Sequence, residues 1–532
     1  MFKSRRTIFH TTSRPTRRFG FYLRTGLLLL ITVLVATALY AHFSRPDSVI
    51  KASSLTLPLN PNTKLGQLAT HYMSENQTSA ADQSGFYPLS DGQEALLARI
   101  ALIENSEQSL DLQYYIYRDD STSSLLTHAI FQAAERGVRV RILLDDMQSR
   151  SDSDMAALAA HDNIELRLFN AFDNRVLRML DFLTNFSQMN RRMHNKALIA
   201  DSAFAIAGGR NIGDEYFAAN HDVDFGDFDL LLAGNSVAEI SHQFDLYWNS
   251  TPATPIEALV EVGQAPTAEQ VTQWQRQLRN HFDGSEYSAN INQLPLMRAL
   301  NGKTLPLYWG EAKVYYDQPS KVYQPDQSQL MLHSLGDILS QADSSFVLVS
   351  PYFVPTQAGT DLLTKAAQEG LDITIITNSL ASNDVFAVHG WYAKYRKQLI
   401  ESGINLYEVK ADPQAKKNYS WLGSSRTSLH AKTFVIDGRK IFAGSFNFDP
   451  RSAFLNTEMG VLINAPEFVT DALMNVDDIL HKSAYQLMLD NQGDLLWINH
   501  QTHRRYDSEP DASIWLRIGA WIAGILPIET QL

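Results

Sequence analysis

The chain has 532 residues, 45% of them hydrophobic and 10% aromatic, which is enough for a globular protein with two domains of ordinary size. Its formal net charge of −13 argues against a broad basic surface for nucleic acid. The absence of cysteine excludes disulfides, thiolate metal sites and a cysteine-linked lipid anchor.

The first segment of the chain predicts a membrane anchor. Residues 1–46 contain basic but no acidic side chains, and residues 25–41 form an uninterrupted run of apolar and small residues. Extended to 21–43, this run approaches the length that spans a bilayer. The preceding basic residues predict a cytoplasmic N-terminus, with the body of the protein outside the cytoplasm. A signal peptide cleaved after Ala41 is the alternative, but the long apolar run favours an uncleaved anchor.

Next come a polar tether and the start of the folded body. The tether covers residues 44–84 and includes one short helix near 65–73. Ser90 or Asp91 can then cap a helix that carries apolar residues on one face. A strand at 111–117, a helix at 125–137 and a strand at 138–146 follow. This order predicts a βαβ unit with a parallel strand pair.

A cluster of polar residues follows in the sequence HNKALIAD. It contains His194, Lys196 and Asp201, and the sequence AGGRN adds Gly209 and Asn211. We expect strand, tight turn and strand here. His194 and Lys196 are two positions apart and therefore share one face of the strand.

The second half of the chain repeats this plan after a connecting insertion at 251–300. Its strands are expected at 346–354 and 371–378, with a helix at 359–370 between them. The cluster returns in HAKTFVID and AGSFN, with these members: His430, Lys432, Asp437, Ser445 and Asn447. The repeat predicts two similar α/β domains with one site at their interface.

The C-terminal residues 513–529 place apolar side chains at helical spacing. The segment is short for a membrane span, and its tryptophans suit the lipid headgroup region. Two interpretations remain open: a helix lying in the membrane interface, or a terminal helix docked on the body.

The repeated residue types fit chemistry at phosphorus. A neutral imidazole can attack phosphorus, and a second, protonated imidazole can donate a proton to the leaving oxygen. Lysine and asparagine can hold the charge of the transition state, so we expect neither a metal nor another cofactor.

The remaining candidates have supporting or binding roles. Asp201 and Asp437 belong to the candidate catalytic set, but each stands at a strand end, where we expect it to support the site. Arg191 and Arg192 could neutralise a second anionic headgroup, although solvated charge is the usual fate of such a pair. Gly209 and Ser445 complete the candidate substrate-binding residues.

The paired motifs resemble the phospholipase D superfamily. Residues 109–146 and 350–410 are similar to the two core units of bacterial cardiolipin synthases, and the sequences around both motifs are most similar to the cardiolipin synthase C branch. The resemblance runs from about residue 85 to the C-terminus. It implies two pseudo-twofold-related α/β/α sandwich domains, at 85–300 and 301–490. They follow a basic segment and anchor at 1–43 and the tether, and they precede a tail at 491–532.

The resemblance also implies roles for the site residues. His194 would be the nucleophile that forms a phosphatidyl-histidine, and His430 the acid and then the base. In this family a downstream acid orients each histidine. Asp227, or less favourably Asp229, would serve His194, and Glu458 would serve His430.

These observations predict a phosphatidyl transferase that makes cardiolipin at the bacterial inner membrane, on the periplasmic side. Its substrates would be phosphatidylglycerol and, as a donor, phosphatidylethanolamine. A hydrolytic phospholipase D would use the same residues with water as acceptor. A nuclease is disfavoured by the acidic charge and the anchor, and a non-enzymatic scaffold by the completeness of both motifs. The sequence indicates no accessory protein.

Overall fold

A computed structural model describes residues 51–75, 83–148, 150–175, 177–217, 219, 225–260, 267–283, 294–302, 304–411 and 428–532, with a few positions between 22 and 32. The chain divides into two compact units, residues 1–48 with 172–189 and residues 49–171 with 190–532. The first unit contains α6 (Met179–Met189). All elements discussed below belong to the second unit, which carries both copies of the motif.

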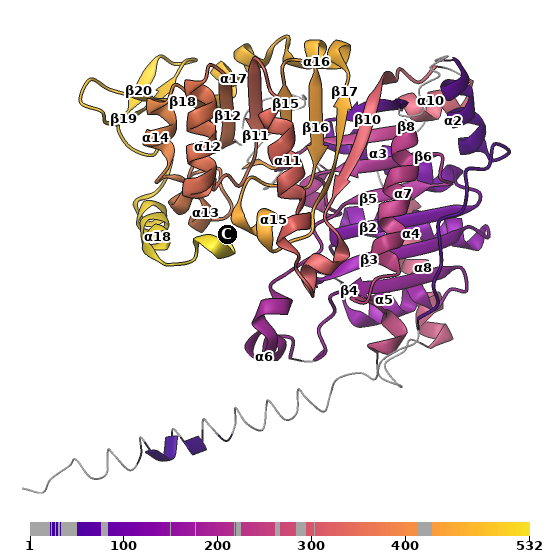
Figure 1. Ribbon diagram of the computed structural model, residues 1–532. Coiled ribbons are helices and arrows are strands. Elements are labelled where there is room, and N and C mark those ends of the chain that lie inside the picture. Colours follow the sequence, from indigo (N-terminus) through magenta and orange to yellow (C-terminus); the bar gives the residue numbers. More distant parts are fainter. Residues whose placement is uncertain are drawn as a thin grey trace, which may run out of the picture. The chain divides into compact units, whose positions relative to one another are not determined.

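The second unit is built on a sheet of 18 strands in the described part of the chain (Figure 1). Its first half contains β1 (Gln83–Leu89), β2 (Ser109–Ile116), β3 (Arg139–Gln148), β4 (Ile164–Phe169), β5 (Ala197–Ala200), β6 (Phe204–Gly208), β8 (Asp229–Gly234) and β9 (Ala253–Pro255). Its second half contains β10 (Tyr308–Tyr316), β11 (Ser345–Val349), β12 (Asp372–Asn378), β13 (Asn405–Val409), β15 (Thr433–Ile436), β16 (Lys440–Gly444), β17 (Met459–Asn464), β18 (Ala484–Leu489), β19 (Leu495–Asn499) and β20 (Arg504–Tyr506).

The two halves have the same strand order. In the first half the neighbours run β4, β3, β2, β5, β6, β8, β1, and in the second they run β13, β12, β11, β15, β16, β17, β10. The strands β2, β3 and β4 are parallel, as are β11, β12 and β13, which confirms the expected βαβ units. An antiparallel pairing of β1 with β10 joins the halves.

Helices cover the sheet. Those of the first half are α2 (Lys64–Glu75), α3 (Gly92–Asn105), α4 (Ser121–Glu135), α5 (Asp152–Ala159) and α7 (Asn235–Trp248). The connection between the halves adds α8 (Ala268–Asp283) and α10 (Pro295–Leu300). Those of the second half are α11 (Met331–Ser340), α12 (Thr356–Gln368), α13 (Phe386–Tyr392), α14 (Arg396–Glu401), α15 (Pro450–Phe454), α16 (Pro466–Leu473), α17 (Val476–Ser483) and α18 (Ile514–Ile525).

The described residues form three large hydrophobic cores and one small cluster around Leu380, Ala512 and Ala520. The first lies under α3 and α4, and the second lies under α11, α12 and α14, which Figure 1 shows together on one side of the second half's strands. The third is shared: α7 of the first half and α16 of the second contribute to it together with strands of both halves. A shared core of this kind holds the two halves in one compact unit.

Local signals in the sequence explain several boundaries. Asp91 caps α3, since its carboxylate accepts a hydrogen bond from the amide of Glu94 at 2.7 Å. The helices α4 and α12 end just before Gly137 and Gly370, whose positive φ angles of 92° and 106° favour glycine.

The described part of the expected tether is packed on the first half. Leu65, Ala69 and Tyr72 of α2 are buried, and the amide of Thr56 donates to the carboxylate of Asp245 at 2.8 Å. The expected anchor at 21–43 lies almost entirely outside the described residues. No helix within the described ranges is both long and apolar enough to cross a membrane.

The C-terminal tail begins as part of the sheet, because β19 and β20 extend it beyond β18. Its last helix, α18, packs on α13 through small residues. A Cβ atom added to Gly390 would stand 2.1 Å from the carbonyl oxygen of Ala520, so only glycine allows this approach. The tail is therefore docked on the body.

Candidate active site

Both motif histidines precede their strands. The strands β5 and β15 begin at Ala197 and Thr433, so the histidines and lysines lie in the extended segments just before them. The expected strand positions were wrong by a few residues, but the i, i+2 relation holds. The Nζ of Lys196 donates to the carbonyl of His194 and that of Lys432 to the carbonyl of His430, each at 2.6 Å.

Each histidine binds a carboxylate from the other half of the chain. The Nδ1 of His194 lies 2.8 Å from Oε2 of Glu458, and the Nδ1 of His430 lies 2.5 Å from Oδ2 of Asp227. The two acids predicted from the sequence are the right ones, but the predicted pairing was wrong. In the structure Glu458 serves the first histidine and Asp227 the second.

Backbone contacts between the halves bring each acid to the histidine of the opposite half. The short strands β7 (Phe225–Gly226) and β14 (Ser428–Leu429) pair in parallel, and the amide of His430 donates to the carbonyl of Gly226 at 2.7 Å. On the other side, the amide of His194 donates to the carbonyl of Thr457 at 2.8 Å. Each histidine thus lies beside the segment that carries the acid of the opposite half.

The residue after the first glycine of AGGRN and of AGSFN helps to position one of the two acids. A Cβ atom at Gly209 would lie 2.1 Å from Oδ1 of Asp227, so glycine makes room for this carboxylate. Ser445 stands at the same place in the second motif, and its hydroxyl donates to Oε2 of Glu458 at 2.5 Å. Both residues therefore help to hold the acids in place.

The asparagines lie close to the site in different settings. Oδ1 of Asn211 accepts a hydrogen bond from the amide of Ile116 at 3.1 Å. Oδ1 of Asn447 is buried and has no hydrogen-bond partner within the residues that the structure describes. A buried amide oxygen of this kind is available to a hydroxyl group of a ligand.

Asp201 and Asp437 do not lie among the histidines and lysines. Asp201 accepts hydrogen bonds from the backbone amides of residues 107–109, and Asp437 from those of residues 343–345. They lie at the far ends of β5 and β15, roughly 15 Å along the strand from the lysines. Their contacts fix a turn, and the geometry does not support a catalytic role for Asp201 or Asp437.

The arginines before the first motif differ from each other. Arg192 is fully buried and pairs with Asp145 at 2.8 Å, which contradicts both a headgroup contact and a solvated charge. Arg191 is partly buried. Asp229, the weaker candidate for orienting a histidine, instead binds Arg99 at 2.9 Å and Arg210 at 3.3 Å.

Electrostatics show that the two motifs share one environment. Burial, together with the positive charges of Lys196 and Lys432 and with His430, lowers the pKa of His194 well below its ordinary value. Burial, opposed in part by Asp227, lowers the pKa of His430. Burial also lowers the pKa of Lys196 to about 7 and that of Lys432 to about 8.

The two acids differ in ionisation. Burial raises the pKa of Glu458 to about 7. Burial also opposes the ionisation of Asp227, but His430, Lys432 and Arg210 outweigh it and the pKa of this carboxyl is lowered. Asp227 is therefore the stronger support for a positive charge on its histidine.

Three aromatic side chains that pack against the histidines were not predicted from the sequence. Tyr115 meets His194 edge-on with ring centroids 5.0 Å apart, and Tyr216 meets His430 in the same way at 5.3 Å. Phe225 stacks on His430 at 5.1 Å. These residues are ordinary components of strands and turns in the sequence, and no local pattern distinguishes them.

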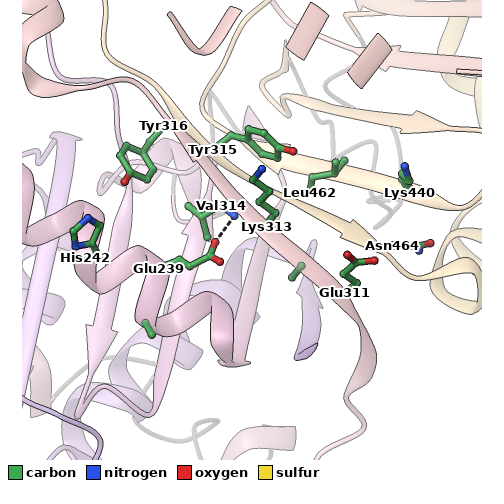
Figure 2. A pocket seen from close by; sticks show the side chains of 12 residues that line it. Glu239, His242, Glu311, Lys313, Val314, Tyr315, Tyr316, Lys440, Leu462 and Asn464 are labelled. Atoms are coloured by element: carbon green, nitrogen blue, oxygen red, sulfur yellow. Dashed lines mark hydrogen bonds between the residues drawn. The ribbon is translucent and has the colours of Figure 1, made fainter. Parts of the chain in front are cut away.

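Two other features of the surface and interior do not belong to this site. The cavity in Figure 2 measures about 730 Å³ and is lined by residues of α7, β10, β16 and β17, none of them from the motifs. His389, Glu408 and Glu509 have ligand atoms close enough to hold a metal ion. However, the guanidinium of Arg396 already binds Glu408 at 2.9 Å and Glu509 at 2.6 Å, so a cation is supplied by the chain itself.

Two α/β halves that build one His–Lys site from repeated motifs define a phospholipase D-like protein. The chain matches the family described as "Cardiolipin synthase, PLD-like domain" over residues 100–248 and 335–479, and it belongs to this family. It is 38% identical to cardiolipin synthase C of Escherichia coli over 460 residues, which cover 85% of this chain and 96% of the relative.

More distant proteins are also similar to this chain over most of its length. A cardiolipin synthase of Geobacillus kaustophilus is 26% identical over 82% of this chain and 72% of its own length. Among solved structures, a phosphatidylserine synthase of Haemophilus influenzae aligns with a TM-score of 0.55 at 14% identity, covering 87% of this chain and 100% of that one. This last similarity concerns the fold alone.

Proposed function

We propose that this protein is a phosphatidyl transferase that makes cardiolipin from phospholipids through a covalent phosphatidyl-histidine. The observation that supports the proposal most directly is that each motif histidine binds a carboxylate from the other half of the chain. Both motif histidines, each with its own carboxylate, are buried together with Lys196 and Lys432. Family membership and the names of the relatives support a lipid phosphodiester as substrate.

The first step transfers the phosphatidyl group to the enzyme. With Nδ1–H donating to Glu458, neutral His194 presents the lone pair of Nε2 to phosphorus. A P–N bond forms and the P–O bond to the headgroup breaks, while His430 gives its proton to the leaving oxygen. His430 suits this role because Asp227, which stays ionised, offsets part of the lowering of the His430 pKa by burial and so supports its protonation.

The second step returns the group to a lipid. The hydroxyl of a second phosphatidylglycerol gives its proton to His430 and forms a P–O bond, and the P–N bond to His194 breaks. Two phosphatidylglycerol molecules thus yield one cardiolipin and one glycerol. Lys196, Lys432 and the amide of Asn447 would stabilise the charge on the phosphoryl oxygens.

The location that suits this reaction is a membrane surface. We place the chain at the bacterial inner membrane, with the segment 21–43 as a single-pass anchor and the body on the periplasmic side. The outer face of α18 supports contact with lipid, since Trp515 and Trp521 are 79% and 67% exposed and Ile514 and Ile525 lie beside them in an exposed row.

Product analysis with purified full-length protein tests the proposal. With phosphatidylglycerol labelled in its acyl chains, we expect labelled cardiolipin and free glycerol from the wild type, and at least a 100-fold loss in His194→Ala. His430→Ala should show a loss of the same order, because it lacks the acid of the first step and the base of the second. Wild-type protein stopped with denaturant during turnover should carry label, which mass spectrometry would locate on His194. Phosphatidic acid formed without cardiolipin would mean that the protein is a hydrolase. A wild type that leaves the lipid intact would remove the proposal.

A further inference from the structure

The polar groups around the two motif asparagines can be compared position by position. The bridge of Tyr117 with Ile212 in the first half corresponds to the bridge of Phe353 with Phe448 in the second. The separation in sequence between these bridges is the same as that between the two motif histidines. Equivalent residues can therefore be assigned in this region without a gap.

The segment that follows the second motif turns one row of side chains toward the site. Phe446 and Phe448 pack into the core under α11, α12 and α14. Because side chains alternate along an extended segment, Ser445, Asn447 and Asp449 point the other way. The hydroxyl of Ser445 binds one of the two acids, which identifies this other face as the face of the site.

Two side chains at this face have no counterpart in the first half. Asp449 stands where the first half has Gly213, and Tyr352 stands where it has Ile116. The hydroxyl of Tyr352 donates to the two carboxylate oxygens of Asp384, at 2.9 and 2.8 Å. The half that contains His430 thus has an additional carboxylate and an additional phenol.

The asparagines differ as well. Oδ1 of Asn211 is occupied by the amide of Ile116, whereas Oδ1 of Asn447 has no hydrogen-bond partner among the described residues, although Asn447 is only 5% exposed. Asp449 is buried too, and its Oδ1 accepts from the amide of Ser452 at 2.7 Å. A carboxylate has lone pairs for further donors. A buried acceptor without a donor, as in Asn447, indicates that a ligand supplies the donor.

The charges near these acceptors favour a hydroxyl over an ammonium group as the donor. The carboxylates of Asp384 and Asp449 act on Lys432, so the three charged groups share one environment. Lys196 acts on both motif histidines and adds a second positive charge. A cationic headgroup would be repelled by the two lysines, whereas an alcohol donates a hydrogen bond without bringing a charge.

We infer that Asn447, Asp449 and Tyr352 form a subsite that binds the hydroxyls of a glycerol headgroup. The inference rests on the proposed function, in which His430 protonates the alcohol that leaves and deprotonates the alcohol that enters. Both alcohols lie opposite His194 on phosphorus, and therefore on the side of the second half. In both, the reacting oxygen of the glycerol has a second hydroxyl on the neighbouring carbon.

Each acceptor then has a distinct role. Oδ1 of Asn447 and the carboxylate of Asp449 accept from the hydroxyls of the headgroup, while the Nδ2 of Asn447 remains available to a phosphoryl oxygen. The phenol oxygen of Tyr352 has given its proton to Asp384 as a hydrogen bond and can itself accept one. The first half, with Ile116 and Gly213 at these positions, offers no such row of acceptors.

Competition between small alcohols tests the inference. Purified full-length protein receives acyl-labelled phosphatidylglycerol with equal concentrations of 1,2-propanediol and 1-propanol, which differ only in the second hydroxyl. Mass spectrometry gives the ratio of the two phosphatidyl alcohols, which does not depend on the amount of active enzyme or on the rate of the first step. We expect the wild type to prefer the diol at least tenfold, because a hydrogen bond to a buried charged group is worth about that factor.

Two variants remove acceptors from the subsite, and each has a matched control. Asp449→Ser keeps a capping hydroxyl for α15 but removes the carboxylate, and Tyr352→Phe removes only the phenol oxygen. We expect the preference to fall about tenfold in the first and about threefold in the second. Asp91→Ser replaces the cap of α3 in the same way, and Tyr308→Phe breaks a similar pair with Asp471 at 3.1 Å. Both controls should retain the wild-type preference.

Failure of the inference can be told from failure of the proposed function. A wild type that forms neither cardiolipin nor a phosphatidyl alcohol would remove both. If cardiolipin forms but the two alcohols are used equally, or if Asp449→Ser and Tyr352→Phe keep the wild-type ratio, these residues bind no headgroup hydroxyl. Ethanolamine in place of the diol should show no preference over 1-propanol. A preference for ethanolamine that Asp449→Ser abolishes would identify an ammonium site and overturn the assignment to glycerol.

Discussion

At the scale of single residues, the two motif histidines belong to the same His-x-Lys pattern in sequence but have different environments in the structure. Glu458, beside His194, has a pKa raised to about 7, whereas the pKa of Asp227, beside His430, is lowered. Because each acid comes from the opposite half, no local pattern could show this difference. The motif predicted the histidines and the lysines, and the family resemblance implied both acids, but neither could show which acid meets which histidine.

The lysines lead to a prediction about pH. Burial lowers the pKa of Lys196 to about 7 and of Lys432 to about 8, so their charge is present below these values and lost above them. We expect kcat/KM, which reports the free enzyme, to fall by about tenfold per pH unit from pH 7, where Lys196 loses its charge, and more steeply above pH 8, where Lys432 loses its charge as well. The profile is measured from pH 5 to 10.

Two variants show whether the lysines cause this fall. Lys432→Arg keeps its charge at all these pH values, so the steeper fall above pH 8 should disappear while the fall from pH 7, which Lys196 causes, remains. The maximum of this variant is lower because the guanidinium has a different shape. The exposed Lys313 lies outside the motifs, and Lys313→Arg should leave the profile unchanged. A wild-type profile that stays flat to pH 10 would contradict the explanation.

At the scale of elements, helical periodicity predicted α18 but left open whether it docks on the body or lies in a membrane interface. The structure shows that α18 docks on the body through one face, while its opposite face is exposed. Ala520, Ala523 and Gly524 form the face that packs on α13, and the tryptophans and isoleucines lie on the exposed face. Periodicity finds an apolar stripe, but only the size of the residues on each side tells which face meets protein and which remains free.

Contact of α18 with lipid can be measured on the full-length chain in lipid nanodiscs. Brominated acyl chains quench tryptophans that enter the bilayer interface. We expect Trp515→Phe combined with Trp521→Phe to remove most of the quenching, although the chain holds 8 tryptophans. Trp309→Phe, on β10 in the sheet, is the control and should change nothing. Quenching that persists in the double variant would show that this face of α18 stays in water.

At the scale of the whole molecule, the internal repeat predicted two similar halves and the parallel units within them. It did not predict that one sheet runs through both, because the pairing of β1 with β10 joins strands more than two hundred positions apart. It also did not predict the pairing of β7 with β14, which lies beside the contact of His430 with Asp227. Both features depend on long-range backbone pairing, and the periodicity of a sequence does not specify which residues pair across two distant strands.

The completeness of the site within one chain leads to a last prediction. His194, Glu458, His430 and Asp227 all belong to the second compact unit of a single molecule. A chain with His194→Ala and a chain with His430→Ala should therefore remain inactive when they are co-expressed and purified together, at least 100-fold below the wild type. Wild-type chains co-expressed with His194→Ala should retain activity in proportion to their share. If the two inactive chains restored cardiolipin synthesis together, halves from different molecules would have to combine, as in domain swapping, and the site would belong to a dimer.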